Sequence, residues 1–122
     1  MREKALILFA HGARDPRWAE PFQRLQAMTR KAQPSIRVEL AFLDLMTPTL
    51  PTLVKQLVEE HVLDITIAPV FLGQGGHVLT DLPNMVMTLR TSYPQLKLKQ
   101  LEAVGEDSLV LAAIRDCCLR GL

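Results

Sequence analysis

An almost wholly apolar run of eight residues, Ile65 to Leu72, is the feature that most constrains the fold. The run is rich in β-branched residues and is followed directly by Gly73, a pattern typical of a strand buried on both faces. Pro69 has no backbone donor, so we expect a bulge or the end of the strand near it. A second apolar run, Ala5 to Ala10, has the same character. Strands buried on both faces predict a parallel sheet that is covered by helices.

Segments with strand and helix patterns alternate four times along the chain. The expected strands span residues 4–10, 36–42, 65–72 and 97–101, and the expected helices span about 17–32, 50–60, 78–92 and 107–119. This alternation predicts an α/β fold with helices on both faces of the sheet. We expect a flavodoxin-like open parallel sheet of four strands in the order 2-1-3-4. The chain also divides into two similar halves near residues 61–64, although no sequence identity between the halves is evident.

The composition limits the possible partners and location of the protein. A chain of 122 residues predicts one domain, residues 1–122, and a net charge of +1 gives no case for nucleic acid or a membrane as partner. The apolar runs are shorter than the ~18 residues of a membrane span, and the N-terminal residues show no signal-peptide pattern. The adjacent Cys117 and Cys118 suit free thiols better than a disulfide or a zinc site. We therefore expect a cytoplasmic protein.

Each of the two buried strands is followed by a histidine beside glycine. His11 comes directly after the first strand and precedes Gly12, and His77 follows the third strand after a turn with Gly75 and Gly76. In the order 2-1-3-4 the first and third strands are neighbours, and open parallel sheets bind ligands where the strand order reverses. We therefore expect both imidazoles on the rim of one crevice, with the glycines leaving room for a large flat ligand.

Three further residues or segments have a simpler interpretation. Asp81 lies four residues after His77, so a shared helix face would let its carboxylate orient the imidazole. The glycine-rich turn is a weak candidate for a phosphate loop, because it has neither GxxxxGK[ST] nor GxGxxG. His61 lies between a helix and a strand, and we interpret it as structural.

Three motifs carry a resemblance to a known family. They are HGARDP at residues 11–16, VELAFLD at 38–44 followed by Pro48, and PVFLGQGGH at 69–77 followed by Asp81 and Pro83. In this order they resemble the small single-domain class II chelatases that act on sirohydrochlorin, relatives of the longer cobalt- and iron-inserting enzymes. The usual family form has serine where this chain has Ala13. The resemblance extends from the first strand to the third helix, and residues 107–122 carry no matching motif.

The resemblance implies a chelatase-like fold and a metal-inserting lyase. The implied reaction is ATP-independent insertion of Co²⁺, Fe²⁺ or Ni²⁺ into sirohydrochlorin, for cobalamin or siroheme biosynthesis or the nickel tetrapyrrole, with no organic cofactor. His11 and His77 would hold the metal, since imidazole suits these ions, and either could accept a pyrrole proton. Glu39 matches the acidic position of the family and is the next candidate for proton removal, although a solvated strand residue is an equally simple interpretation.

The resemblance also implies partners for the substrate's eight carboxylates. Arg14 and Arg17 follow His11 closely and are the expected carboxylate ligands, while Gly75 and Gly76 would border the macrocycle. Longer members of the family hold two lobes around the active site, so the resemblance implies a homodimer for a chain with one lobe.

Two other classes of function compete with the enzyme. A non-catalytic metal or tetrapyrrole carrier predicts stoichiometric capture without turnover. An inert flavodoxin-like module predicts that substitution of His11 and His77 changes nothing. Within the enzyme hypothesis no residue discriminates between the metals, because the same imidazoles bind all three.

Overall fold

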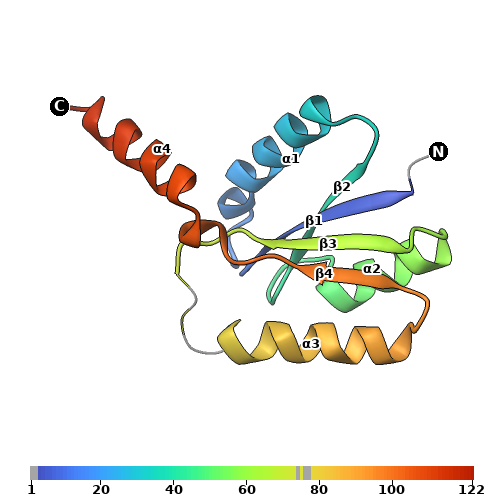
Figure 1. The fold of residues 1–122 in the computed structure, drawn as a ribbon. Coiled ribbons are helices and arrows are strands. Elements are labelled where there is room, and N and C mark those ends of the chain that lie inside the picture. Colours follow the sequence, from blue (N-terminus) through green and yellow to red (C-terminus); the bar gives the residue numbers. More distant parts are fainter. Residues whose placement is uncertain (1–2, 74, 76–77) are drawn as a thin grey trace.

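A computed structural model describes residues 3–73, 75 and 78–122 of the chain. Its four strands form one parallel sheet in the order β2-β1-β3-β4, which confirms the predicted fold class and strand order (Figure 1). The strands are β1 (Lys4–Ala10), β2 (Arg37–Phe42), β3 (Asp64–Pro69) and β4 (Lys97–Gln100). The two apolar runs of the sequence therefore form the two central strands.

Strand β3 ends earlier than the apolar run that predicted it. It stops at Pro69, which cannot donate to the ladder, as the sequence suggested. The Val70 N–H still donates to the Phe9 carbonyl at 2.7 Å, but beyond it the chain leaves the sheet and Leu72 is 58% exposed. The end of the apolar run therefore lies at the carboxyl edge of the sheet, next to the end of β1.

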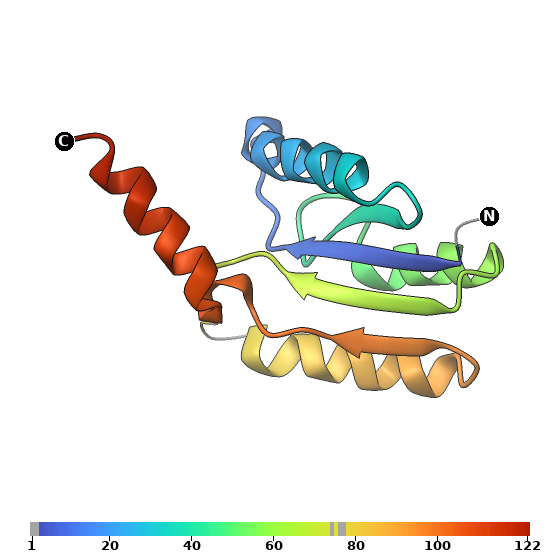
Figure 2. The ribbon, with the colours of Figure 1, turned by 45° about the horizontal axis from the view of Figure 1, so that its top comes forward.

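Three helices cover the sheet on both faces. Helix α1 (Glu20–Ala32), which follows the 3₁₀ turn η1 (Pro16–Ala19), lies on one face, and α2 (Leu50–Glu59) and α3 (Val78–Ser92) lie on the other (Figures 1 and 2). The larger part of the core joins α2 and α3 to Ile7, Phe9, Ile65 and Ile67 of the central strands. Burial of these apolar side chains is the main stabilising term of the fold.

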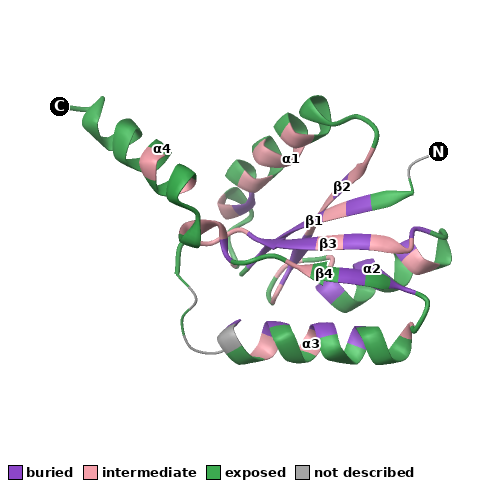
Figure 3. Cartoon of the chain, in the orientation of Figure 1, coloured by how far each residue is buried: buried purple, intermediate pink, exposed green. Residues whose placement is uncertain are grey.

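Helix α4 (Ser108–Leu119) does not join this core. The Asp107 carboxylate caps it by accepting from the Leu109 N–H at 2.7 Å, as the sequence allowed. None of its residues is buried, and it projects away from the sheet beyond the 3₁₀ turn η2 (Val104–Glu106) (Figure 3). Cys117 and Cys118 are exposed on it as free thiols. The prediction of helices on both faces therefore holds for α1 to α3, while α4 covers neither.

Within the described ranges, none of the helices has the length and apolar character that crossing a membrane would require.

Candidate functional site

His11 directly follows the last residue of β1 and is exposed at the carboxyl edge of the sheet. Two backbone hydrogen bonds fix its position: the Asp44 N–H donates to the His11 carbonyl at 3.1 Å, and the Leu43 N–H donates to the Ala10 carbonyl at 2.9 Å. These bonds extend the β1–β2 pairing beyond both strand ends. The loop after β2 therefore lies beside the histidine.

Gly12 makes the turn after His11 possible. Its φ is +93°, a conformation that L side chains rarely adopt, and a Cβ atom here would lie 1.8 Å from the Asp44 carbonyl oxygen. Only glycine fits both the backbone conformation and the close approach of the neighbouring loop. The position of His11 therefore depends on a residue that the sequence motif places directly after it.

Phe71 brings the end of β3 into the site. The centroids of the His11 and Phe71 rings are 4.8 Å apart with an interplanar angle of 46°, and Phe71 also packs edge-on against Phe9 at 6.5 Å. The ends of β1 and β3 therefore meet at the point where the strand order reverses, as the topology predicted. Sequence reasoning missed Phe71, because it counted this residue as part of the buried strand.

The second predicted metal ligand, His77, lies outside the described residues, and so does Gly76. Gly75 is described and exposed, and among the described residues no atom lies within 4 Å of the place where its Cβ would be. Its carbonyl accepts from the Val78 N–H at 3.3 Å, at the start of α3. Of the part of the chain that the structure describes, nothing fills the space beside Gly75.

Asp81 lies in the first turn of α3 and is half-buried. It lines a groove of about 350 Å³ between α2 and α3, together with Pro51, Asn84 and Met85 among others. The first turn of α3 is the position from which we predicted that the Asp81 carboxylate would orient His77.

Arg14 is exposed and lines a groove of about 390 Å³ at the carboxyl edge of the sheet. The loop after β2 forms the opposite wall with Leu45 and Met46, and Leu45 is 57% exposed. A cationic side chain opposite apolar side chains suits a ligand with an apolar body and acidic substituents. Arg14 lies three residues along the chain from His11.

Arg17 is held by a carboxylate of its own chain. Its guanidinium pairs with Asp15 at 2.7 Å through two nitrogens, and both side chains are exposed. The side-chain hydrogen bond from Arg17 lowers the pKa of the Asp15 carboxyl, and the same bond raises the pKa of Arg17. Both groups stay charged near neutral pH, so Arg17 is a less available carboxylate ligand than Arg14.

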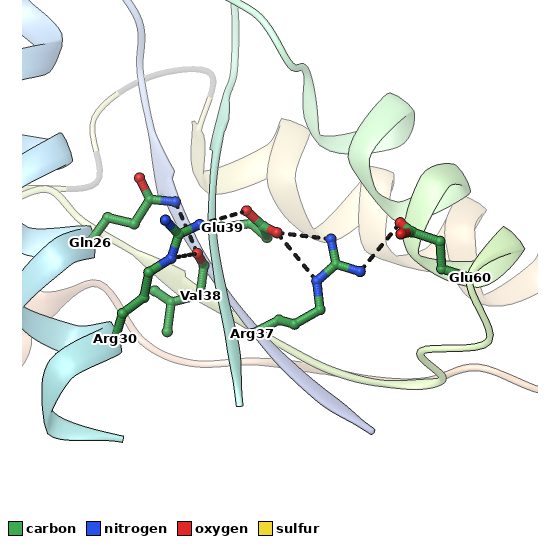
Figure 4. A network of polar contacts seen from close by, with 6 residues as sticks. All are labelled: Gln26, Arg30, Arg37, Val38, Glu39 and Glu60. Carbon is green, nitrogen blue, oxygen red and sulfur yellow. Dashed lines mark hydrogen bonds and ion pairs between the residues drawn. The ribbon is translucent and has the colours of Figure 1, made fainter. Parts of the chain in front are cut away.

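Glu39 takes part in a network of ion pairs at the outer edge of β2 (Figure 4). Its two carboxylate oxygens accept from Arg30 of α1 at 3.1 Å and from Arg37 at 2.9 Å, and Arg37 also pairs with Glu60 at 3.3 Å. Arg30 donates a further bond to the Val38 carbonyl at 3.0 Å. These contacts occupy the open edge of β2, which would otherwise present free backbone acceptors.

The structure does not bring Glu39 to the site of His11. Glu39 is in register with Ile7, four residues before His11, so the two lie about 13 Å apart along the strand direction. A role for Glu39 in proton removal stays a prediction.

The ligands available to a metal ion are few in the described ranges. No group of three or more His, Cys, Asp or Glu side chains is gathered there.

Comparison with known proteins extends this picture to the whole chain. A family model described as CbiX matches residues 5–119. The sirohydrochlorin cobaltochelatase of Methanocaldococcus jannaschii is 31% identical over 83 residues, which are 68% of this chain and 58% of that protein. The sirohydrochlorin ferrochelatase of Bacillus subtilis is 26% identical over 113 residues, which are 92% of this chain and 43% of that protein. The chain thus spans less than three fifths of the length of either relative.

Solved structures show the same fold. A CbiX protein from Marinobacter aquaeolei VT8 matches with a TM-score of 0.85 and 30% identity, over 97% of this chain and 96% of that one. SirB from Bacillus subtilis subspecies spizizenii, in complex with cobalt, matches with a TM-score of 0.74 and 24% identity, over 93% of this chain and 49% of that one. At this lower identity the likeness concerns the fold alone.

Proposed function

The chain belongs to the CbiX family, and we propose that it catalyses the ATP-independent insertion of a divalent metal ion into sirohydrochlorin. The proposed substrate metals are Co²⁺ and Fe²⁺, since the curated relatives are named cobaltochelatases and a ferrochelatase. In this proposal residues 1–122 act as one domain, and no organic cofactor takes part. The main support from the structure is the exposed imidazole of His11, fixed at the point where the strand order reverses.

The proposed chemistry begins with the metal at His11. A neutral imidazole binds iron, cobalt or nickel without cancelling the charge of the ion, so the ion stays attractive to pyrrole nitrogens. His77 is the proposed second ligand, and Asp81 the residue that orients it; both assignments rest on the motif. As metal–nitrogen bonds form, two pyrrole N–H protons leave the macrocycle. Once the metal has moved to the macrocycle nitrogens, the freed imidazole of His11 or of His77 is proposed to accept one of these protons, and solvent water takes the other; imidazole can fill this role near neutral pH.

The proposed substrate contacts are chosen from the charges of the arginines after β1 and from the small size of the glycines before α3. Arg14 is the first candidate for the substrate carboxylates, because its side chain is exposed in the groove beside the loop after β2. Arg17 is the second and would have to exchange Asp15 for the substrate. Gly75 and Gly76 are proposed to border the macrocycle, where larger side chains would intrude. Glu39 is the least favoured catalytic group, because two arginines already occupy its carboxylate.

We propose further that two copies assemble as a homodimer, so that two crevices enclose the macrocycle. A cytoplasmic location, expected from the sequence, also belongs to the proposal. Whether the product serves cobalamin or siroheme synthesis follows from the metal that the enzyme prefers.

The test is an anaerobic optical assay. The protein is mixed with sirohydrochlorin and Co²⁺, Fe²⁺ or Ni²⁺, and the absorption of the macrocycle is followed with time. We expect turnover above the uncatalysed rate, reduced about 100-fold or more in His11→Ala and in His77→Ala. A spectral change that only tracks the amount of protein, without turnover, would replace the enzyme by a carrier. Unchanged rates in both variants would remove the histidines from the mechanism.

A further inference from the structure

Leu45, in the loop after β2, has a backbone conformation that leucine rarely adopts. Its φ is +67°, in the left-handed region where the Cβ atom of an L residue crowds its own backbone. Among the described residues other than glycine, only His61 shares this feature. His61 follows the end of α2, where a left-handed residue commonly terminates a helix. Leu45 terminates no helix, so its conformation needs a different explanation.

The loop that carries Leu45 is held at several points. The Leu45 N–H donates to the Asp44 carboxylate at 2.8 Å, and the Phe42 N–H donates to the Pro48 carbonyl at 2.9 Å, which closes the base of the loop. The backbone bond from Asp44 to the His11 carbonyl attaches the same loop to the end of β1. The strained residue therefore belongs to a loop that is fixed beside His11.

The side chain of Leu45 gains little within the chain from this strain. It is 57% exposed, whereas the next side chain, Met46, packs against the buried cluster of Ala10, Ala19 and Phe42. Glycine or asparagine would adopt the same backbone conformation more easily, and an exposed leucine adds little to the stability of the fold. Backbone strain of this kind is concentrated at sites that bind ligands.

A second exposed leucine lies at the matching place after β3. Leu45 comes three residues after the end of β2, and Leu72, which is 58% exposed, comes three residues after the end of β3. The backbone before Leu72 is also fixed, because the Phe71 carbonyl accepts from the Gly105 N–H at 3.2 Å and the Phe71 ring packs on His11. Both leucines are thus presented by segments with a defined position.

His11 lies between the two leucines along the edge of the sheet. Strand β1, which His11 follows, is flanked by β2 and β3 (Figure 1). Neighbouring strands are about 4.8 Å apart, so the ends of β2 and β3 are about 10 Å apart across the end of β1. The carboxyl edge of the sheet therefore presents an exposed imidazole with an exposed leucine on each side of it.

We propose that Leu45 and Leu72 are positioning residues that support one face of the sirohydrochlorin macrocycle on either side of His11. This inference rests on the proposed function and adds the side chains that orient the ring. A ring that lies across both leucines has its central nitrogen atoms opposite the imidazole, and its carboxylates extend beyond the leucines toward Arg14. Apolar side chains then bury the body of the ligand while a cation pairs with its substituents, as is usual in ligand pockets.

The first experiment measures the dissociation constant of metal-free sirohydrochlorin by anaerobic equilibrium dialysis, without any divalent metal ion. Leu45→Asn and Leu72→Asn should each raise this constant about tenfold, since each removes an apolar contact with the ring. The double variant should raise it about 100-fold, because contacts about 10 Å apart contribute independently. Leu45→Met keeps an apolar side chain and should bind within about threefold of the parent.

The matched control is Met28→Gln, which replaces a 68% exposed apolar side chain of α1 by a polar amide and should leave the dissociation constant unchanged. An effect of Met28→Gln as large as that of the leucine variants would overturn the proposal.

Urea unfolding and light scattering separate support of the ligand from other roles of the leucines. Asparagine adopts the left-handed conformation more readily than leucine, so Leu45→Asn should unfold at the same or a higher urea concentration than the parent while its binding weakens. A lower unfolding midpoint with unchanged binding would make Leu45 a structural residue. A changed molar mass with unchanged binding would place the leucines in an interface between copies of the chain. Either result overturns the proposal.

Binding without metal and turnover with metal test the two proposals separately. If the unsubstituted chain binds the macrocycle through both leucines but inserts no metal, the support by the leucines stands and the proposed enzyme fails. If the chain inserts metal, and Leu45→Asn and Leu72→Asn bind the macrocycle as tightly as the parent, the enzyme stands and the support fails.

Discussion

The half of the chain from β1 to α2 and the half from β3 to α4 have the same order of elements, yet their last helices end in different surroundings. Helix α2 buries four apolar side chains against the sheet, and α4 buries none (Figure 3). The connections do not differ in length, since α2 begins eight residues after the end of β2 and α4 begins eight residues after the end of β4. An apolar stripe therefore predicts that a helix can pack on an apolar surface, but it does not predict which surface the helix packs on.

The edge strands differ in the same sense. In β2, Arg37 and Glu39 point to the α2 side and neutralise each other, with Arg30 and Glu60 completing the network. Their counterparts sixty residues later are Lys97 and Lys99, two exposed cations. The first half thus satisfies its charges and apolar groups within one chain. In the second half, Lys97 and Lys99 are exposed and α4 has no buried residue.

Paired substitutions in α2 and α4 should show the largest difference between the halves. Leu57→Ala removes a fully buried side chain and should lower the free energy of unfolding by about 2–5 kcal/mol. Cys117→Ala, sixty residues further along the chain on α4, should change that free energy by less than about 0.5 kcal/mol in the monomer, because Cys117 is exposed. Urea unfolding of each variant against its own parent measures both. A large loss from Cys117→Ala in the monomer would mean that α4 folds back onto its own sheet.

Alanine substitutions of Gly12 and Gly105, one in each half, compare two glycines at which a Cβ atom would collide with a neighbouring backbone. Gly12→Ala should cost about 1–3 kcal/mol of stability or more, since φ is +93° and the new Cβ overlaps the Asp44 carbonyl. It should also reduce chelatase activity, because His11 precedes it. Gly105→Ala meets the Leu72 backbone at 1.9 Å and should be similarly destabilising, but without the direct link to the histidine. Activity of the folded fraction, measured at a temperature where both variants are native, separates the two; an equal loss would place Gly105 at the active site.

The sequence predicted the sheet more fully than the site, for physical reasons. The composition of a buried strand identifies it in the sequence, so the two apolar runs predicted the two central strands and the position of His11 at the end of the first. The order 2-1-3-4 followed from the alternation of strands and helices, which predicts a flavodoxin-like sheet. The contact between His11 and Phe71 depends on the chain leaving the sheet after Pro69, and the periodicity gave no sign that Phe71 lies outside the strand. The ion pair of Glu39 with Arg30 depends on how α1 docks over the edge of β2, which no local pattern encodes. Helix α4 was predicted from its residues, but its apolar stripe does not indicate the direction in which the helix leaves the sheet.

The contact between the two halves at the candidate site, His11 with Phe71, should give a smaller effect. Phe71→Leu keeps an apolar side chain against Phe9 but removes the ring that packs on His11 at 4.8 Å. Aromatic pairs contribute about 0.5–1.5 kcal/mol beyond burial, so we expect kcat/KM of metal insertion to fall about twofold to tenfold. Phe71→Tyr should restore it. The control is Phe22→Leu, which removes the ring contact with Trp18 at 4.6 Å and should leave kcat/KM unchanged.

The smallest expected difference concerns the edge strands, and it decides the role of Glu39. If the carboxylate serves the network at the edge of β2, Glu39→Gln weakens two ion pairs and lowers the free energy of unfolding by about 1 kcal/mol or less, because these pairs are partly open to solvent. We expect this result, together with metal insertion within about twofold of the parent, since Glu39 lies beside Ile7 rather than beside His11. Lys99→Gln, at the equivalent position of β4, removes a charge with no ion pair among the described contacts and should leave the free energy of unfolding of the monomer unchanged. A loss of activity from Glu39→Gln of about 100-fold with intact stability would instead give the carboxylate a part in proton removal, and the edge of β2 would then belong to the active site.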